Sequence, residues 1–416
     1  MITLLPERPR RGEELNPMST FKITEGRGQL VEPLAFTNEE FERRLNSLKA
    51  LMQEKGLDYF ISFTPENIYY LTGHDSPGYY FYQAMVVSHK ELPVNVLRRV
   101  ESSNTILKSW SRRTVIYQDT EDPVAATHWY LAELGLKGKR VGLECDAWFV
   151  SPRRYNELVE RIGRDGGKVE GIHLIEHFRV IKSEEELRII REAARVTDQG
   201  MRAAIEASHV GATEDQVAAR CLARLVECGG EYAGLPPFIT SGQRTLLCHA
   251  TWGGRTFRFG DVLNFELAGV RHRYGAALFR CGTVGPAPED ARRLADACIA
   301  ALDAVVAKLK PGVTSHEGHM TNRMSLTKHG YGDLHGHRTA YSIGINYPPD
   351  WGEGHIFSLW EGDDRPIKAN MVLHIVPGIF VPGRFLINIS ETVLVTEKGC
   401  ERLTNYPHGL FEASAG

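Results

Sequence analysis

Two helix-start signals constrain the fold of this chain most strongly. Thr37-x-x-Glu40 and Ser183-x-x-Glu186 are both capping boxes, and apolar residues at helical spacing follow each of them. The chain has 416 residues, whereas a single core seldom grows beyond about 250–300 residues. We therefore predict two domains that each open with a helix, at residues 36–180 and 181–416, preceded by a flexible leader over residues 1–35.

The pattern of elements differs between the two predicted domains. In the first, short β-type runs alternate with helical segments, which predicts an α/β domain; the runs lie at 58–63, 85–88, 114–118, 140–144 and 172–175, the helices at 124–136 and 154–162, and a loop at 163–171. In the second, helices from 183, at 213–228 and at 294–309 accompany strands at 262–267, 278–284, 372–376 and 392–396. This order predicts an α+β domain with helices packed on a mostly antiparallel sheet.

Composition excludes several classes of protein. The 49 basic and 52 acidic residues give a net charge of −3, so neither a nucleic-acid footprint nor a polybasic membrane contact is expected. No apolar run reaches the roughly 20 residues of a membrane span, and residues 1–20 lack the apolar region of a secretory signal. The seven cysteines include no C-x-x-C pair, which favours reduced thiols over a disulfide framework or a zinc ribbon. We expect a cytoplasmic enzyme.

Six polar segments in the second domain could carry chemistry. They lie at 247–252, 264–269, 335–338, 341–344, 348–353 and 389–392. Their order, with the helix entry at 179–186 and the Val376-Pro377-Gly378 turn, resembles the creatinase/aminopeptidase P/methionine aminopeptidase family. This resemblance implies a creatinase-like N-terminal domain and a pita-bread catalytic domain. The stretches 341–353 and 265–269 are most similar to the ectoine hydrolase branch, whose members work without metal.

The family's metal ligands are the first point to test. Its peptidases hold two divalent ions with carboxylates and one histidine, and the matching positions here are Glu266, Ala277, Tyr341, Val376 and Ser390 or its neighbour Glu391. Alanine and valine offer no lone pair, and a two-ion site needs several bridging carboxylates. The resemblance therefore implies that the dinuclear site is lost, and we expect no metal and no cofactor.

Three residues are the candidate catalytic groups. His249 matches the family's first active-site histidine, which implies proton transfer; the alternative is an ordinary loop histidine. Glu266 lies in an apolar strand, where a carboxylate needs a shifted pKa or a charged partner, so catalysis and a structural ion pair are both open. Glu391 lies beside the family's last carboxylate position, but a one-residue offset on a strand would turn its side chain to the other face.

Five residues are candidates for substrate binding. Tyr341 replaces a metal ligand, so its hydroxyl is expected to project into the site, and His337 matches a histidine that contacts the reacting carbonyl in related peptidases; His335 has no such match and is expected to be solvated. Trp351 would cover a ring or a cation, or anchor its loop. The resemblance implies a homodimer in which the first domain closes the partner's site, with Arg98 and Tyr82 near the substrate. A solvated turn and an aromatic core are the alternatives for these two.

These features predict a metal-independent hydrolase that cleaves a C–N bond in a small, carboxylate-bearing cyclic amidine or guanidino compound of the ectoine or creatine type. A metal-dependent Xaa-Pro peptidase or lyase of the same family, and a ligand-binding pseudoenzyme, are the alternatives. Where the ectoine hydrolase branch is expected to carry a histidine, this chain has Tyr274-Gly275-Ala276-Ala277. This departure favours a different substrate.

Overall fold

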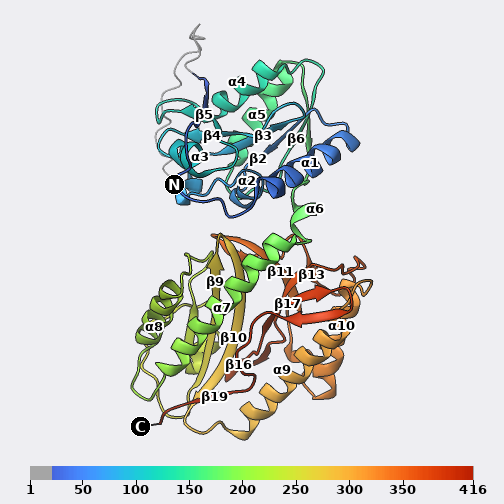
Figure 1. Ribbon diagram of the computed structural model, residues 1–416. Helices are drawn as coiled ribbons and strands as arrows, with labels where there is room; N and C mark the ends of the chain where they lie inside the picture. The colour runs from blue at the N-terminus through green and yellow to red at the C-terminus, as the bar shows by residue number, and fades with distance from the viewer. Residues whose placement is uncertain (1–20, 416) are drawn as a thin grey trace, which may run out of the picture. The chain divides into compact units, whose positions relative to one another are not determined.

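The computed structural model describes residues 21–415 and divides into two compact units (Figure 1). The first unit comprises residues up to 34, 49–64 and 71–172, and the second comprises 35–48, 65–70 and 173 onward. The segment 35–48 groups with the second unit through the buried guanidinium of Arg44. That group pairs with Glu40 at 2.8 Å and lies 3.9 Å from Glu186, the glutamate of the second capping box.

The elements of the chain up to residue 172 follow the α/β pattern predicted for the first domain. In chain order they are β1 (Ile23–Glu25), α1 (Asn38–Glu54), β2 (Tyr59–Ser62), α2 (Pro65–Thr72), η1 (Pro77–Tyr80), β3 (Ala84–Ser88), β4 (Val94–Arg98), α3 (Ser102–Lys108), β5 (Arg113–Tyr117), α4 (Pro123–Leu134), β6 (Arg140–Leu143), α5 (Pro152–Arg164) and β7 (Lys168–Gly171).

The first unit is built on one mixed sheet with the strand order β1-β5-β4-β3-β2-β6-β7. Asp122 and Ser151 cap α4 and α5, and a proline follows each cap at the first helical position. Two predictions were wrong here. Residues 23–25 of the expected leader form an edge strand paired with β5, and the last strand lies at 168–171, inside the expected loop, rather than at 172–175. Residues 1–20 lie outside the described residues.

The second unit contains the remaining elements. They are α6 (Glu176–Arg179), α7 (Glu184–Glu206), α8 (Glu214–Glu227), β8 (Phe238–Ser241), η2 (Gly242–Leu246), β9 (Val262–Arg271), β10 (Tyr274–Val284), α9 (Glu289–Lys308), α10 (Ser315–Lys328), η3 (Gly332–Leu334), β11 (Ala340–Tyr347), β12 (Asp350–Gly352), β13 (Ser358–Leu359), β14 (Val372–Ile375), β15 (Ile379–Val381), β16 (Phe385–Ile387), β17 (Glu391–Thr396), β18 (Gly399–Arg402) and β19 (Phe411–Ala413).

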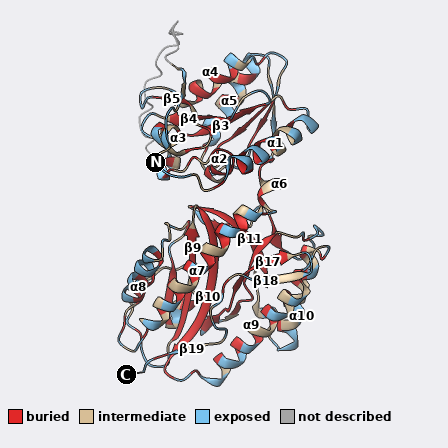
Figure 2. Cartoon of the chain, in the orientation of Figure 1, coloured by how far each residue is buried: buried red, intermediate tan, exposed pale blue. Residues whose placement is uncertain are grey.

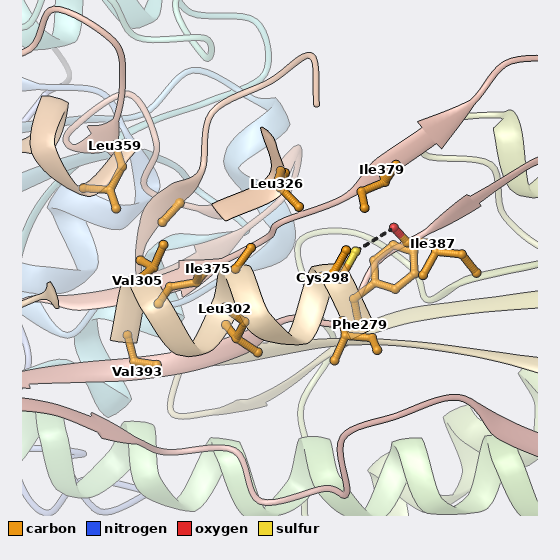
Figure 3. Close-up of a cluster of buried hydrophobic side chains, with 14 of the residues drawn as sticks. Phe279, Cys298, Leu302, Val305, Leu326, Leu359, Ile375, Ile379, Ile387 and Val393 are labelled. Carbon is orange, nitrogen blue, oxygen red and sulfur yellow. Dashed lines mark hydrogen bonds between the residues drawn. The ribbon is translucent and has the colours of Figure 1, made fainter. Parts of the chain in front are cut away.

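A ten-stranded sheet is the core of the second unit, and its main path runs β18-β17-β14-β11-β10-β9-β8. Its pairings are antiparallel except for β10 with β19, as the sequence predicted. The long strands β9 and β10 are buried along almost their whole length (Figure 2). Apolar side chains of α9 pack against this sheet, with Cys298 and Leu302 beside Phe279 of β10 (Figure 3). Among residues 21–415 no helix is long and apolar enough to cross a membrane.

Candidate active site

Glu266 lies near the middle of β9, where it is less buried than the residues on either side of it. In the strand register Glu266 is directly opposite Phe238 of β8 and Phe279 of β10. Two residues along, Ala268 is opposite Ala277. Directly opposed residues, and those two apart on one strand, share a face of the sheet. Two alanine methyl groups therefore border the Glu266 carboxylate on the side where the family's second carboxylate would stand.

The environment of Glu266 favours its protonated form. Burial, and then the negative charge of Asp350, raise the pKa of Glu266 to about 8, while Arg338 acts in the opposite direction. Within the described part of the chain, the Glu266 carboxylate forms no hydrogen bond or ion pair of its own. The alternative of a structural ion pair is therefore not what the structure shows, and the carboxylate is left with its hydrogen-bonding capacity unused.

A chain of hydrogen bonds near Glu266 connects Trp351, Tyr341, His374, Ser390 and the backbone of Phe279. Tyr341 of β11 is directly opposite His374 of β14 in the register. The Tyr341 hydroxyl lies 2.8 Å from Nδ1 of His374 and accepts a hydrogen bond from Nε1 of Trp351 at 2.9 Å. Nε2 of His374 lies 2.6 Å from Oγ of Ser390, which in turn accepts a hydrogen bond from the backbone N–H of Phe279 at 2.7 Å.

The donor in each of these hydrogen bonds depends on which ring nitrogen of His374 carries its hydrogen. His374 is neutral, because burial and the charges of Arg338 and Arg280 lower its pKa to about 3, so one ring nitrogen donates and the other accepts. Ser390 is fully buried, and Nε2 of His374 is the acceptor that the described residues offer to its hydroxyl. We assign the tautomer that gives the buried Ser390 hydroxyl an acceptor, in which Nδ1 of His374 carries the hydrogen and donates to Tyr341.

Tyr341 consequently has a hydrogen to give. In the assigned tautomer its oxygen accepts from Trp351 and His374, and its own O–H has no acceptor among the described residues. Burial raises the pKa of Tyr341 well above its ordinary value, and the negative charge of Glu266 adds to this effect. The hydroxyl therefore stays protonated, and its role as a donor to a substrate oxygen remains a prediction.

Phe238 connects the remaining candidates to this group. Its ring packs 5.1 Å from Trp351 and 5.4 Å from His249, measured between ring centroids. His249 is exposed, in a loop after η2, and its φ of 59° is unusual for a non-glycine residue. Trp351 is buried and gives its N–H to Tyr341. Trp351 thus positions Tyr341 and anchors its loop, and Phe238 lies between it and the exposed imidazole.

His337 lies on the loop that leads into β11. Its Nδ1 is 2.7 Å from the carbonyl oxygen of Arg338, and burial lowers its pKa to about 4. Its ring lies 4.5 Å from that of His335. The expectation that His335 is solvated was wrong, because its Nδ1 lies 2.9 Å from the Gly378 carbonyl oxygen and its Nε2 is buried.

Glu391 does not face Glu266. Ser390 is hydrogen-bonded to His374, and Thr392 is hydrogen-bonded to the backbone of Ala277. Because side chains alternate along a strand, the intervening Glu391 turns to the other face of the sheet. There its carboxylate forms a buried ion pair with Arg280 at 2.5 Å and contacts Nε2 of His408 at 2.8 Å. The hypothesis that Glu391 is catalytic is therefore dropped, because its charge is already neutralised by a structural partner.

Arg98 and Tyr82 belong to the first unit. Tyr82 is buried in the core of that unit, where its hydroxyl lies 2.8 Å from Oγ1 of Thr127; it forms part of an aromatic core and cannot contact a substrate in this conformation. Arg98 pairs with Asp119 and stacks over the ring of Phe81 at 4.0 Å. Its guanidinium is thus already engaged.

The donor set around Glu266 does not fit a pair of divalent ions. Tyr341 and Ser390, at two of the ligand positions, are joined through His374 in the hydrogen-bond chain, and Ala277 and Val376 supply no donor atom. Among the described residues, no group of three His, Cys, Asp or Glu side chains within ligand distance includes Glu266. Glu266 alone lacks the bridging carboxylates that two cations need.

Sequence reasoning did not identify His374 or Arg338 as parts of this site. His374 interrupts the apolar run 371–380, and a histidine inside a buried strand is a signal of a polar partner. Arg338 directly follows His337 at the end of the segment 335–338. Its guanidinium lies over the ring of Tyr341, 4.4 Å from the centroid.

Comparison with known families assigns both halves of the chain. Residues 44–181 match the Creatinase/Prolidase N-terminal domain, and residues 188–397 match metallopeptidase family M24. Among solved structures, the fold is similar to a prolidase from Thermococcus sibiricus, with a TM-score of 0.80 and 23% identity over 90% of this chain and 99% of that one.

Several curated proteins are similar over nearly their full length. The ectoine hydrolase of Halomonas elongata is 29% identical over 91% of this chain and 98% of its own. An uncharacterized hydrolase/peptidase of Sinorhizobium fredii, y4tL, is 32% identical with the same coverage. The Xaa-Pro dipeptidase of Pyrococcus furiosus is 26% identical over 89% of this chain and all of its own.

Proposed function

The chain belongs to metallopeptidase family M24, with a Creatinase/Prolidase N-terminal domain and a pita-bread catalytic domain, and from this premise we propose that it is a metal-independent hydrolase. Its substrate is a small, carboxylate-bearing cyclic amidine or guanidino compound, of the type represented by ectoine and creatine. The reaction is hydrolysis of one C–N bond. The similarity to an ectoine hydrolase supports this class of substrate.

One observation carries the proposal. Glu266 stands at a metal-ligand position of a metallopeptidase family, yet the groups around it are tied to one another by the chain from Tyr341 through His374 to Ser390. The metal site is thus replaced by one carboxylate with no partner among the described residues, and by one hydroxyl with a hydrogen to give. A reacting carboxylate and a nearby hydrogen-bond donor are the groups that hydrolysis without metal requires.

The proposed chemistry uses Glu266 and His249. Ionised Glu266 either takes a proton from a water molecule that attacks the amidine carbon, or attacks that carbon itself and is released by water in a second step. The C–N bond then breaks, and His249 delivers a proton to the departing nitrogen. Tyr341 donates its hydrogen bond to an oxygen of the substrate. Trp351 orients the Tyr341 hydroxyl through its N–H. His337 lies on the loop that leads into Tyr341 and is a candidate contact for the substrate.

We propose further that the protein is a homodimer in which the first unit closes the partner's site. Aromatic side chains exposed on the first unit support this, since clusters of this kind are uncommon on monomer surfaces. Tyr80 and Trp148 are 75% and 82% exposed, and the rings of Tyr79 and Phe149 pack edge to face with centroids 5.2 Å apart. These residues replace the buried Tyr82 as the candidate contacts. Light scattering at micromolar concentration is expected to give twice the chain mass; a fully active monomer would contradict the proposal.

A substrate panel tests the proposed function. Purified protein is incubated with ectoine, 5-hydroxyectoine, creatine, guanidino acids and Xaa-Pro dipeptides, with and without a chelator, and products are identified by mass spectrometry. We expect hydrolysis of a compound from the first four groups that the chelator does not affect. Cleavage of the dipeptides alone, lost on chelation and restored by Mn²⁺, Co²⁺ or Zn²⁺, would identify a metal-dependent Xaa-Pro dipeptidase. Binding without any product would identify a pseudoenzyme.

Substitution of the two reacting groups tests their roles. Glu266→Gln preserves volume but removes the basic and nucleophilic carboxylate, so turnover is expected to fall by at least about 100-fold. Turnover of His249→Ala is expected to fall by a similar factor. Turnover of the double variant should be little lower than that of either single variant, because the effects of members of one proton-transfer unit are non-additive. Glu397→Gln, on an exposed turn, is the matched control and should keep full turnover.

A further inference from the structure

Arg338 is a cation without a counter-ion in the described part of the chain. Among residues 21–415 no carboxylate lies within 4.0 Å of its guanidinium, and that group donates no hydrogen bond to a described residue. It is neither fully buried nor exposed, and its guanidinium carbon lies over the ring of Tyr341, 4.4 Å from the ring centroid. Its positive charge acts on the pKa of Glu266 and His374. Arg338 thus stands beside the proposed site with its donors unused.

The segment 351–354 shapes the space that Arg338 occupies. Trp351 donates to the Tyr341 hydroxyl. Gly352 lies so close to the Tyr341 ring that a Cβ there would stand 2.6 Å from a ring carbon. Gly354 lies against Arg338, and a Cβ at this position would overlap its guanidinium. Glycine is thus required at both positions for the ring and the guanidinium to fit where they do.

Glu353, between these glycines, fixes the segment to the core. Its carboxylate pairs with Arg179 at 2.7 Å and with Lys182 at 2.8 Å, and all three side chains are almost completely buried. Although burial raises the pKa of Glu353, Lys182 and Arg179 together lower it to about 2. The loop that cradles Arg338 is therefore held by a permanent ion-pair network, and the guanidinium is preorganised before a ligand arrives.

We infer that Arg338 binds the carboxylate of the substrate, an inference that rests on the proposed function. A planar guanidinium with free donors matches a carboxylate in a two-point contact. The negative charge of Asp350, which also acts on Tyr341, disfavours a dianionic phosphate more than a singly charged carboxylate at the same place. Because the Arg338 guanidinium lies over the Tyr341 ring, an anion bound to it lies next to the Tyr341 hydroxyl, which can donate a hydrogen bond. One substrate carboxylate therefore contacts both groups.

Binding of matched acids and amides tests this inference separately from turnover. Ectoine, creatine and the dipeptide Gly-Pro are each compared with the corresponding carboxamide by calorimetry, in the Glu266→Gln background with a chelator present so that no substrate is consumed. The full-length chain is expected to bind at least one acid roughly 10-fold or more tightly than its carboxamide, the scale of hydrogen bonds to a charged group. Gly-Pro keeps the test valid if the chain proves to be a dipeptidase.

Two variants and two controls locate the effect. Arg338→Gln removes the charge, and Gly354→Ala keeps it but displaces the guanidinium; both are expected to abolish the preference for the acid. Arg195→Gln removes a charge from an exposed position of α7, and Gly336→Ala adds a methyl group where nothing lies within 4 Å; both should keep the preference. Circular dichroism confirms that each variant is folded.

The outcomes separate the two proposals. If the protein binds no acid more tightly than its carboxamide, or if folded Arg338→Gln retains the preference, the assignment of Arg338 is overturned. If the preference depends on Arg338 but only Gly-Pro is cleaved, and only with metal, the assignment holds and the proposed reaction fails.

Discussion

The hydroxyl of Ser390 lies 2.6 Å from Nε2 of His374, and this contact determines which hydrogen Tyr341 can offer. With Ser390 donating, the histidine carries its hydrogen on Nδ1 and Tyr341 accepts from it. Without that donor, His374 could carry its hydrogen on Nε2. The Tyr341 hydroxyl would then donate its hydrogen bond to Nδ1 of His374 and would have none left for a substrate. The sequence places a serine at a metal-ligand position of the family, and the structure gives that serine a role in orienting a tautomer.

We predict that Ser390→Ala lowers turnover by roughly 10-fold, while Ser390→Thr, which keeps the hydroxyl, lowers it less. The reason is that alanine leaves the His374 tautomer unspecified and makes the Tyr341 hydrogen available for only part of the time. Turnover is measured on the substrate found in the panel, and ¹⁵N NMR of the imidazole reports the tautomer. An unchanged tautomer in Ser390→Ala would show that Tyr341 is oriented by another group.

Tyr341→Phe is predicted to destabilise the fold. Removal of the hydroxyl leaves the N–H groups of Trp351 and His374 without their shared acceptor, and an unsatisfied buried donor costs about 1–3 kcal/mol. The free energy of unfolding, measured with urea, should fall by that amount. Tyr80→Phe, at a hydroxyl on a side chain that is 75% exposed, is the matched control and should change the value little. Equal stability of both variants would mean that water replaces the lost acceptor.

Glu391→Gln is predicted to lower stability and not to act on the chemical step. The variant leaves the Arg280 guanidinium buried without its counter-charge, and breaking a buried pair in this way costs about 3–5 kcal/mol. In the exposed pair between Arg191 and Glu401, Glu401→Gln should cost less than about 1 kcal/mol. If Glu391→Gln has the same urea midpoint of unfolding as the wild-type protein but no turnover, Glu391 is a catalytic group and this prediction is wrong.

Sequence reasoning reached the fold class because periodicity and capping are local properties. The helix after Ser183 was predicted from its capping box, which the structure contains in full. The faces of the strands were harder. Glu266 was identified because a carboxylate in an apolar strand is conspicuous, but the orientation of Glu391 depends on a one-residue register that only pairing partners fix. Arg338 reaches Tyr341 because Gly354 leaves room, and the sequence cannot show such a contact between segments.

The last prediction concerns how stability varies with pH. The pKa of Glu266 is raised from its ordinary value of 4.5 to about 8 in the folded protein, chiefly by burial. Between these two values the unfolded chain has released this proton and the native state still holds it, so the native state binds more protons. Stability must then fall as pH rises, with a contribution from this group of at most about 1.4 kcal/mol per pH unit.

Glu266→Gln removes that contribution, because glutamine does not titrate. The difference in the free energy of unfolding between Glu266→Gln and the wild-type protein should therefore grow in favour of the variant from about pH 5 to about pH 8 and level off above that value. Urea denaturation at four pH values measures it, with Glu397→Gln as the control for an exposed carboxylate. Well below pH 4.5 the difference should be constant, since both states of the wild-type protein are protonated there. A difference that stays flat from pH 5 to pH 8 would mean that Glu266 is ionised with an ordinary pKa, and the carboxylate would then need a counter-charge that Arg338 alone could supply.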